Sequence, residues 1–264
     1  MTSSNISSRT ERAKMLWYKS WRETRTVILV GMAAMAIACV LIVLNQQTMR
    51  DHADTPMTYI AYIWKAVYNS VGRDIFVILS IILGSGGLLQ ERAHGTSGFT
   101  LALPVSRGSI VLTRAIIGYF GVLAIAAMPI AVLPIAVLPI ASRYAGQYYP
   151  IAQTLGFAAL WAAGGAVFYG FTFLLSHHLE GEYTSILLAV PSLMLYGVIL
   201  QFPWLAGLRM LNIFDIINGE DMSFFNEAEH LLIAPLPWLT LAVMLAVSFT
   251  FVIFAARRMQ PRDF

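Results

Sequence analysis

Apolar residues are gathered along this chain into six long runs, and polar or charged segments separate them. Runs of this length predict helices that cross a lipid bilayer, because such a helix needs about 20 predominantly apolar residues. The predicted transmembrane helices cover residues 27–44, 62–89, 110–141, 154–176, 184–205 and 236–256. An even number of spans places both termini on the same side of the membrane.

The second run is the least regular. Residues Ile75–Leu89 are apolar but short, and the stretch before them contains Lys65 and Arg73. The aromatic residues between positions 59 and 68 suit the interfacial belt that flanks membrane spans. We therefore extend this span back to residue 62.

Residues 9–26 precede the first run and predict a basic helix that lies beside the bilayer. Trp17 and Trp21 fall four residues apart on one face, and Arg22 and Arg25 lie around the rest. A basic helix with bulky aromatic residues on one side commonly lies in the plane of the lipid head groups. The alternative is a helical extension of the first span, with cations that reach up to the head groups.

The connection over residues 206–235 is too long to be a structureless loop. It is acidic, yet apolar residues recur between Leu208 and Ile217. This pattern predicts short amphipathic or re-entrant helices on the external side of the membrane.

Pro129, Pro134 and Pro139 recur at regular intervals in the third run. Each proline removes a backbone donor and clashes with the preceding turn, so the outer half of this helix is expected to bend or distort. Such a distortion would suit the flexible wall of a pathway. Equally, transmembrane helices simply tolerate proline.

Composition agrees with a membrane class. Of 264 residues, 58% are hydrophobic and 12% are charged, whereas a soluble domain carries about 25% charged residues. With the six apolar runs, this predicts an all-α polytopic membrane protein with a single domain over residues 1–264. The single cysteine, Cys39, excludes an intrachain disulfide. The polar N-terminus lacks the apolar core of a cleavable signal peptide.

Basic residues are divided unevenly between the two sides of this topology. Five lie on the side of the long connection: Arg50, Lys65, Arg73, Arg143 and Arg209. Twelve lie on the side of the termini: Arg9, Arg12, Lys14, Lys19, Arg22, Arg25, Arg92, Arg107, Arg114, Arg257, Arg258 and Arg262. Because basic residues are enriched in cytoplasmic loops, both termini and the segment 91–109 are predicted to be cytoplasmic.

Glycine-rich and histidine-containing segments are the candidates for chemistry. Gly84-Ser-Gly-Gly87 lies in a span and precedes no Gly-Lys-Ser/Thr, so it predicts close helix packing, as Gly164-Gly165 does. The segment His177–Glu182 could hold a metal, but no second set of spaced ligands accompanies it. A solvated turn explains it better. The sequence contains no Walker motif and predicts neither an enzyme nor a cofactor bound to this chain.

The central parts of the spans, with the second taken as its apolar run Ile75–Leu89, contain no Asp, Glu, Lys, Arg or His. Carriers that are coupled to ions or protons place ionisable groups at membrane depth, because they bind or relay charge there. The uncharged spans therefore argue against a secondary transporter. They predict that any transport is driven by another polypeptide.

The segment between the second and third runs carries a family resemblance. Glu91, Gly95-Thr96 and Leu101-Ala-Leu-Pro-Val-Ser-Arg107 resemble the pattern of ABC-2 type transporter permeases, the six-span membrane subunits of type V ABC exporters. The basic start over Leu16–Arg25 is similar to the lead-in helix of that family. The insertion Ser97–Thr100 departs from the pattern at the point where the leucine-rich helix of the family begins.

The resemblance implies that residues 91–107 form a coupling helix, which docks on a separate ABC ATPase. Pro104 is expected to end this helix near Leu103, and the alternative is an ordinary interfacial loop. The residues implied in coupling are Glu91, Arg92, Gly95, Thr96, Phe99, Leu101, Leu103 and Arg107. The implied partners are ATPase chains that bind ATP and Mg²⁺, and a second copy of this chain or a sister permease; nucleic acid is not among them.

Three functions stay open at this point. The first is the permease of an ATP-driven exporter in the plasma (inner) membrane of a bacterium, with an amphipathic, lipid-like, drug or peptide substrate. The second is a non-transporting membrane partner of an ABC ATPase, with a mechanical or regulatory output. The third is an intramembrane enzyme that uses the segment His177–Glu182.

Overall fold

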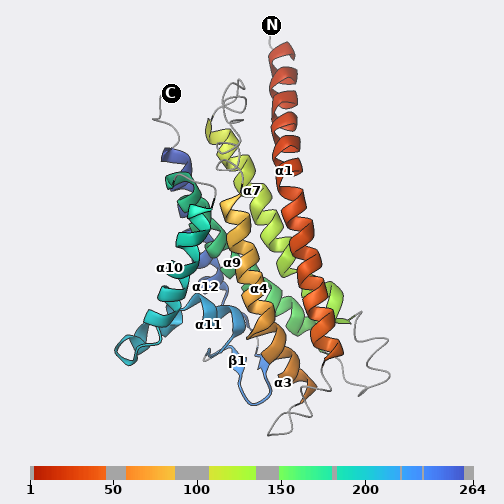
Figure 1. Ribbon diagram of the computed structural model, residues 1–264, viewed down its shortest axis with the longest axis vertical. Coiled ribbons are helices and arrows are strands. Elements are labelled where there is room, and N and C mark those ends of the chain that lie inside the picture. Colours follow the sequence, from red (N-terminus) through yellow and green to blue (C-terminus); the bar gives the residue numbers. More distant parts are fainter. Residues whose placement is uncertain are drawn as a thin grey trace.

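Long helices run side by side along the long axis of the molecule, and the two termini lie at the same end (Figure 1). This computed structural model describes residues 3–45, 58–86, 107–134, 149–179, 183–220, 222–233 and 235–258. The main helices are α1 (Ser3–Leu44), α4 (Val71–Ser85), α7 (Arg107–Ala126), α9 (Ile151–His178), α10 (Thr184–Ile199) and α12 (Trp238–Arg258). Short elements cover the opposite end: α3 (Tyr59–Ile63), the π-turn η1 (Trp64–Tyr68), the 3₁₀ helix η2 (Pro203–Leu211), α11 (Ile213–Asn218), β1 (Phe225–Asn226) and β2 (Leu231–Leu232).

Helix α9 is the centre of the bundle and contacts α4, α7, α10, α11 and α12. Its apolar stretch is 67% buried, against 28% for α1 and for α12. Aromatic side chains fill the space around it: Trp161 stacks on Phe76 of α4, and Phe157 stacks on Tyr68 of η1. A helix that is apolar on all sides and packed on all sides is typical of the core of a membrane bundle.

The glycines expected in helix packing lie at close contacts. A Cβ atom on Gly84 of α4 would stand 2.5 Å from the carbonyl oxygen of Tyr169 in α9. Gly164 lies against Ile217, and Gly165 lies against Phe76. The packing interpretation of Gly84 and of Gly164-Gly165 is confirmed, while Gly87 lies outside the described residues.

Helix α1 continues without interruption from Ser3 to Leu44. The predicted helix over residues 9–26 and the predicted span over residues 27–44 are therefore one helix, and a separate interfacial helix is wrong. The alternative, a helical extension of the first span, matches the structure. Neither Pro nor Gly occurs between residues 9 and 27, so nothing in the backbone favours a break there.

The second predicted span is divided at its polar end. Helix α3 and the π-turn η1 end at Asn69–Ser70, and α4 then begins at Val71. Arg73 Nη1 donates to Asn69 Oδ1 over 3.3 Å, which holds the start of α4 against this break. Taken together, Tyr59–Ser85 is long and apolar enough to cross a membrane.

The third predicted span is interrupted close to its first proline, as expected. Helix α7 ends at Ala126, a turn follows at Ala127, and residues 128–134 are helical again. Pro129 has no N–H to donate to the preceding turn, and Ile130 N donates instead to the oxygen of Ala127 over 3.0 Å. Residues 135–141 of this predicted span lie outside the described residues.

The fifth predicted span differs from the structure. Helix α10 has 16 residues and stops at Ile199, and the 3₁₀ helix η2 follows from Pro203. At 1.5 Å per residue, α10 is about 24 Å long, which is short of the hydrocarbon thickness of about 30 Å. The described residues contain five helices of spanning length and apolarity, not the predicted six. Pro203 accounts for the early end, because helices end at or before the residue that precedes a proline.

The predicted external connection contains the expected short helices, η2 and α11, together with an unexpected strand pair. Strands β1 and β2 are antiparallel, with Phe225 opposite Leu232. Trp64 of η1 stacks on His230 in the turn between the strands, with ring centroids 4.7 Å apart, and its Nε1 donates to Asn218 O over 2.9 Å. The segment is therefore folded back onto the bundle. We call β1, β2 and the turn between them the hairpin, and this end of the molecule the hairpin end.

Candidate functional site

In the sequence, the predicted coupling segment lies between α4 and α7, and the facing ends of these two helices lie toward the end of the molecule that holds both termini. Helix α4 runs toward this end and α7 begins there (Figure 1). Arg107 is the first residue of α7. The other predicted coupling residues lie outside the described residues: Glu91, Arg92, Gly95, Thr96, Phe99, Leu101 and Leu103.

An ion pair ties the first two turns of α7 to α1. Arg114 Nη2 lies 3.1 Å from Glu23 Oε2, and the Arg114 side chain is only 7% exposed. Lys19, one turn earlier on α1, approaches the other Glu23 oxygen at 3.6 Å. Arg114 is buried, whereas Glu23 is one-third exposed. Removing the Glu23 carboxylate would therefore leave a desolvated cation and destabilise the folded protein more than removing the arginine would.

Polar contacts continue from α7 into α9 and α12. Tyr119 of α7 shares a hydrogen bond of 2.7 Å with Ser248 of α12, and Ser248 Oγ donates to the carbonyl oxygen of Ala166 in α9. Tyr169 of α9 donates to the carbonyl oxygen of Arg114 over 3.4 Å. Interhelical hydrogen bonds of this kind hold membrane helices together where the hydrophobic effect between them is weak. Helix α7 is thus bonded to α1, α9 and α12.

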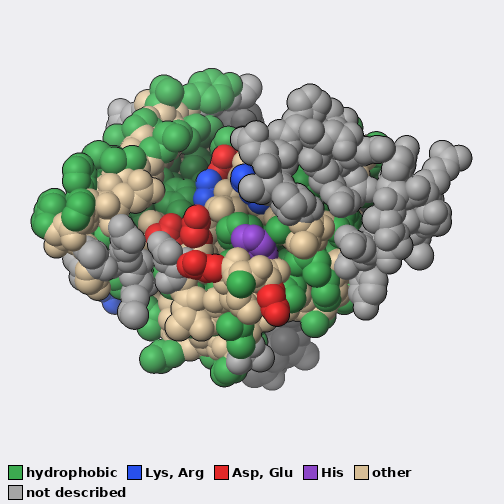
Figure 2. Space-filling view, turned by 90° about the horizontal axis from the view of Figure 1, so that it is seen from below, with side chains coloured by type: hydrophobic (Ala, Val, Ile, Leu, Met, Phe, Trp, Pro, Cys, Tyr) green, Lys and Arg blue, Asp and Glu red, His purple; other side chains and the backbone are tan. Residues whose placement is uncertain are grey.

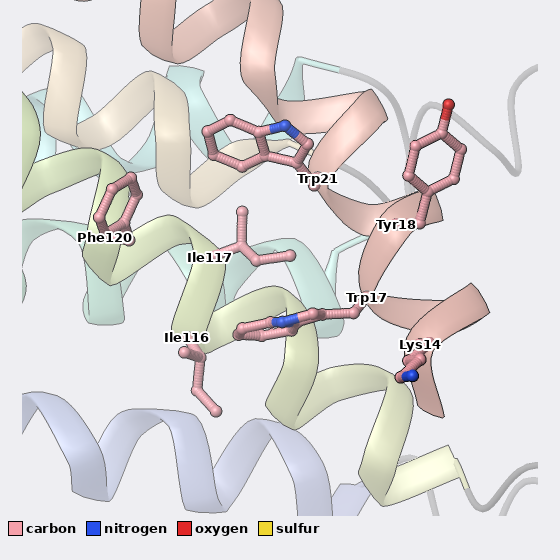
Figure 3. A pocket seen from close by; sticks show the side chains of 7 residues that line it. All are labelled: Lys14, Trp17, Tyr18, Trp21, Ile116, Ile117 and Phe120. Atoms are coloured by element: carbon pink, nitrogen blue, oxygen red, sulfur yellow. The ribbon is translucent and has the colours of Figure 1, made fainter. Parts of the chain in front are cut away.

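An open groove lies between α1 and α7 at the same end, with a volume of about 550 Å³ (Figure 3). Trp21 forms one wall and meets Phe120 edge to face, with ring centroids 6.1 Å apart. Trp17 forms the other wall, one turn of α1 away. Of the residues predicted on the basic helix, Trp17 and Trp21 therefore share a groove, whereas Arg22 and Arg25 are exposed on α1 outside it.

The histidines at the end of α9 have structural partners. His177 Nδ1 lies 2.8 Å from the carbonyl oxygen of Phe173, and His178 Nδ1 lies 2.9 Å from that of Leu174. Within the described part of the chain, no three His, Cys, Asp or Glu side chains come together as metal ligands. Glu180 and Glu182 lie outside that part.

The hairpin end carries a mixed group of charges. Figure 2, a view onto this end, shows acidic, basic and histidine side chains near the middle of the face, with hydrophobic side chains around them. Arg73 Nε donates to Asp74 over 3.0 Å, and Asn218 Nδ2 donates to Glu220 over 3.2 Å. Asn218 also donates to Asn69 over 2.6 Å, which places the Arg73–Asp74 pair at the level of α11 and not in mid-bundle.

Known proteins do not identify the family of this chain, so the class of protein follows from its fold. No protein-family model matches the chain, and no curated protein matches it. Five helices of spanning length, packed around α9, are compatible with a multi-pass α-helical membrane protein.

Proposed function

We propose that this chain is the membrane subunit of an ATP-driven exporter of the ABC-2 type. In this proposal a separate ABC ATPase hydrolyses ATP with Mg²⁺ and docks on residues 91–107. Both termini face the cytoplasm of a bacterium, and the protein lies in the plasma membrane. A second copy of this chain, or a sister permease, completes the pathway.

The arrangement around α7 is the observation that carries the proposal. Helix α7 begins directly after the predicted coupling segment and is bonded to α1 through Arg114 and Glu23. Through Tyr119 and Ser248 it is also bonded to α12 and α9. A displacement of residues 91–107 would therefore move three other helices with α7, as a transmission element requires.

The described spans support an apolar or amphipathic substrate. Ion pairs among the described residues lie toward the two ends: Glu23 with Lys19 and Arg114 at one end, and Arg73 with Asp74 at the other. Between them the bundle is lined by aliphatic and aromatic side chains with scattered hydroxyl groups. A site for a small ion would need ionisable or convergent polar ligands at membrane depth.

Docking is tested by replacing Phe99 and Leu101 with Asp. The double variant should lose the ABC ATPase that co-purifies with wild type in detergent, because two carboxylates replace the apolar anchors. Ala228→Asp is the control: it adds a carboxylate at the exposed turn of the hairpin, at the opposite end. Unchanged recovery of the ATPase with the double variant would contradict the coupling role of residues 91–107.

Transport is tested separately in vesicles that contain the chain and its ATPase. ATP should drive movement of an amphipathic dye, and a Walker-motif substitution in the ATPase should abolish it. An ATPase that binds and hydrolyses ATP without moving any dye or lipid would instead favour the non-transporting partner.

A further inference from the structure

The groove between α1 and α7 has an apolar floor and aromatic walls. Ile116, Ile117 and Phe120 of α7 form the floor, and Trp17 and Trp21 of α1 face each other across it (Figure 3). Both indoles remain partly exposed, at 43% for Trp17 and 38% for Trp21. The volume of about 550 Å³ falls within the range of ligand sites, about 300–1,000 Å³.

One basic side chain stands at the rim of the groove, whose lining is otherwise almost entirely apolar. Lys14 lines it at the end nearest the N-terminus, and no ion pair is formed by Lys14 among the described residues. The indole N–H groups of Trp17 and Trp21 likewise have no hydrogen-bond partner within the described part of the chain. The groove therefore combines an apolar floor and walls with one cationic side chain, Lys14, at its edge.

Charge decides which occupant fits. Helix α1 carries six basic residues and two acidic ones, Glu11 and Glu23, and Glu23 is turned toward Arg114. Glu11 lies one turn before Lys14, yet the helix keeps an excess of four positive charges (six basic minus two acidic residues), so a ligand with its own negative charge complements it. A basic, aromatic helix surface is also the usual receiver of anionic lipid head groups.

We propose that this groove binds one anionic phospholipid from the leaflet on the side of the termini. An acyl chain lies along Ile116 and Phe120 between the two indoles. The phosphate accepts hydrogen bonds from Lys14 and from the indole N–H groups. This proposal requires only that the chain is inserted in a membrane, so it stands or falls independently of an ATPase partner.

The test compares lipid retention by purified full-length variants. Each is reconstituted in nanodiscs of phosphatidylcholine and phosphatidylglycerol, extracted into mild detergent, and its bound lipid is counted by native mass spectrometry. Wild type should retain phosphatidylglycerol in preference to phosphatidylcholine. Lys14→Gln should lower that retention about fivefold, since one basic side chain contributes about that factor at an anionic surface.

Arg25→Gln is the matched charge control, because Arg25 lies on the same helix outside the groove. It should leave retention unchanged; an equal loss with Arg25→Gln would show diffuse attraction instead of a site and overturn the proposal. Equal retention of both lipids by wild type would overturn it too.

A second pair of variants tests the apolar floor without changing charge. Ile116→Trp should fill the groove and displace the lipid, whereas Leu123→Trp, two turns further along α7 and also exposed, should not. If Ile116→Trp changes the ratio of monomer to dimer and leaves lipid retention intact, the groove receives a second copy of the chain and the proposal fails.

Discussion

At the scale of single residues, the bundle depends on places where one helix touches the backbone of another. Gly84 of α4 is the clearest, because its Cα faces the carbonyl oxygen of Tyr169 and the Cβ of Thr172 in α9. Lipid offers no hydrophobic drive for helix association, so close contact through small residues supplies the packing energy. Tyr169 also bonds to α7 through the carbonyl oxygen of Arg114. Gly84 thus lies beside a residue that links three helices.

Gly84→Ala is predicted to destabilise the protein by about 1–3 kcal/mol, the usual effect of overpacking. The new Cβ would lie 2.5 Å from a main-chain oxygen that cannot move without shifting α9. Gly108→Ala is the control, since no atom of the described residues lies within 4 Å of the corresponding Cβ; its melting temperature should be unchanged or higher. Thermal unfolding in detergent measures both, and equal melting temperatures would contradict the close packing of α4 on α9.

At the scale of elements, the hairpin is held to the bundle by aromatic stacking. Trp64 stacks on Phe225 and on His230, with ring centroids at 5.0 and 4.7 Å, and Phe225 and His230 also contact each other at 6.3 Å. His230 itself has a positive φ of 54°. Burial beside Trp64 lowers the pKa of His230, the Lys65 cation adds to this, and Glu227 opposes it. The neutral imidazole is therefore the form that the folded hairpin favours.

The hairpin is consequently predicted to loosen in mild acid. Above the ordinary histidine pKa of about 6.5, both folded and unfolded forms are neutral and the hairpin keeps its full stability. As the pH falls below that value, the unfolded form binds the proton first, so stability is lost progressively until the pH reaches the lower folded pKa. The hydrogen-exchange protection factors of Phe225, Leu231 and Leu232, corrected for the slower intrinsic exchange in acid, should fall over this range.

His230→Asn separates this effect from general acid sensitivity. Asn tolerates the left-handed backbone conformation and does not titrate, so the fall in protection factors below pH 6.5 should disappear even if the hairpin is less stable throughout. An unchanged pH dependence in this variant would assign the effect to the acidic side chains nearby.

At the scale of the whole molecule, the two ends differ in charge. Among the described side chains, cations at the terminus end are Lys14, Lys19, Arg22, Arg25, Arg114 and Arg257, and those at the hairpin end are Lys65 and Arg73. The acidic residues at the hairpin end include Glu220, Glu227 and Glu229. Since basic residues determine orientation, the terminus end is predicted to be cytoplasmic.

Fusions at defined points measure this orientation. Green fluorescent protein at either terminus should fluoresce, whereas alkaline phosphatase inserted after Ala228 should be active only in the periplasm. In the exchanged pair, alkaline phosphatase at the terminus should show no enzyme activity, and the fluorescent protein in the hairpin should not fluoresce. The reverse pattern would invert the topology and place residues 91–107 outside the cell.

The candidate site depended on tertiary structure more than the bundle did. Arg114 counts in the sequence only as one cation near a span, and Glu23 counts only as a partner for Lys19 one turn away. Their contact joins residues 91 positions apart. The hydropathy and charge pattern around either residue does not predict this contact. The groove arises in the same way: periodicity places Trp17 and Trp21 on one face, but Phe120 comes from another helix.

The sequence by itself determined the helical class, the position of most helices and the packing role of Gly84. It did so because the apolar runs that cross a bilayer are local, and so is the absence of a side chain. Tertiary structure decided that α1 is continuous, that α10 is short, and that residues 203–232 fold back over the bundle. These outcomes depend on which side chains meet across helices, and contacts such as Trp64 with His230 are set by the folded chain and not by hydropathy.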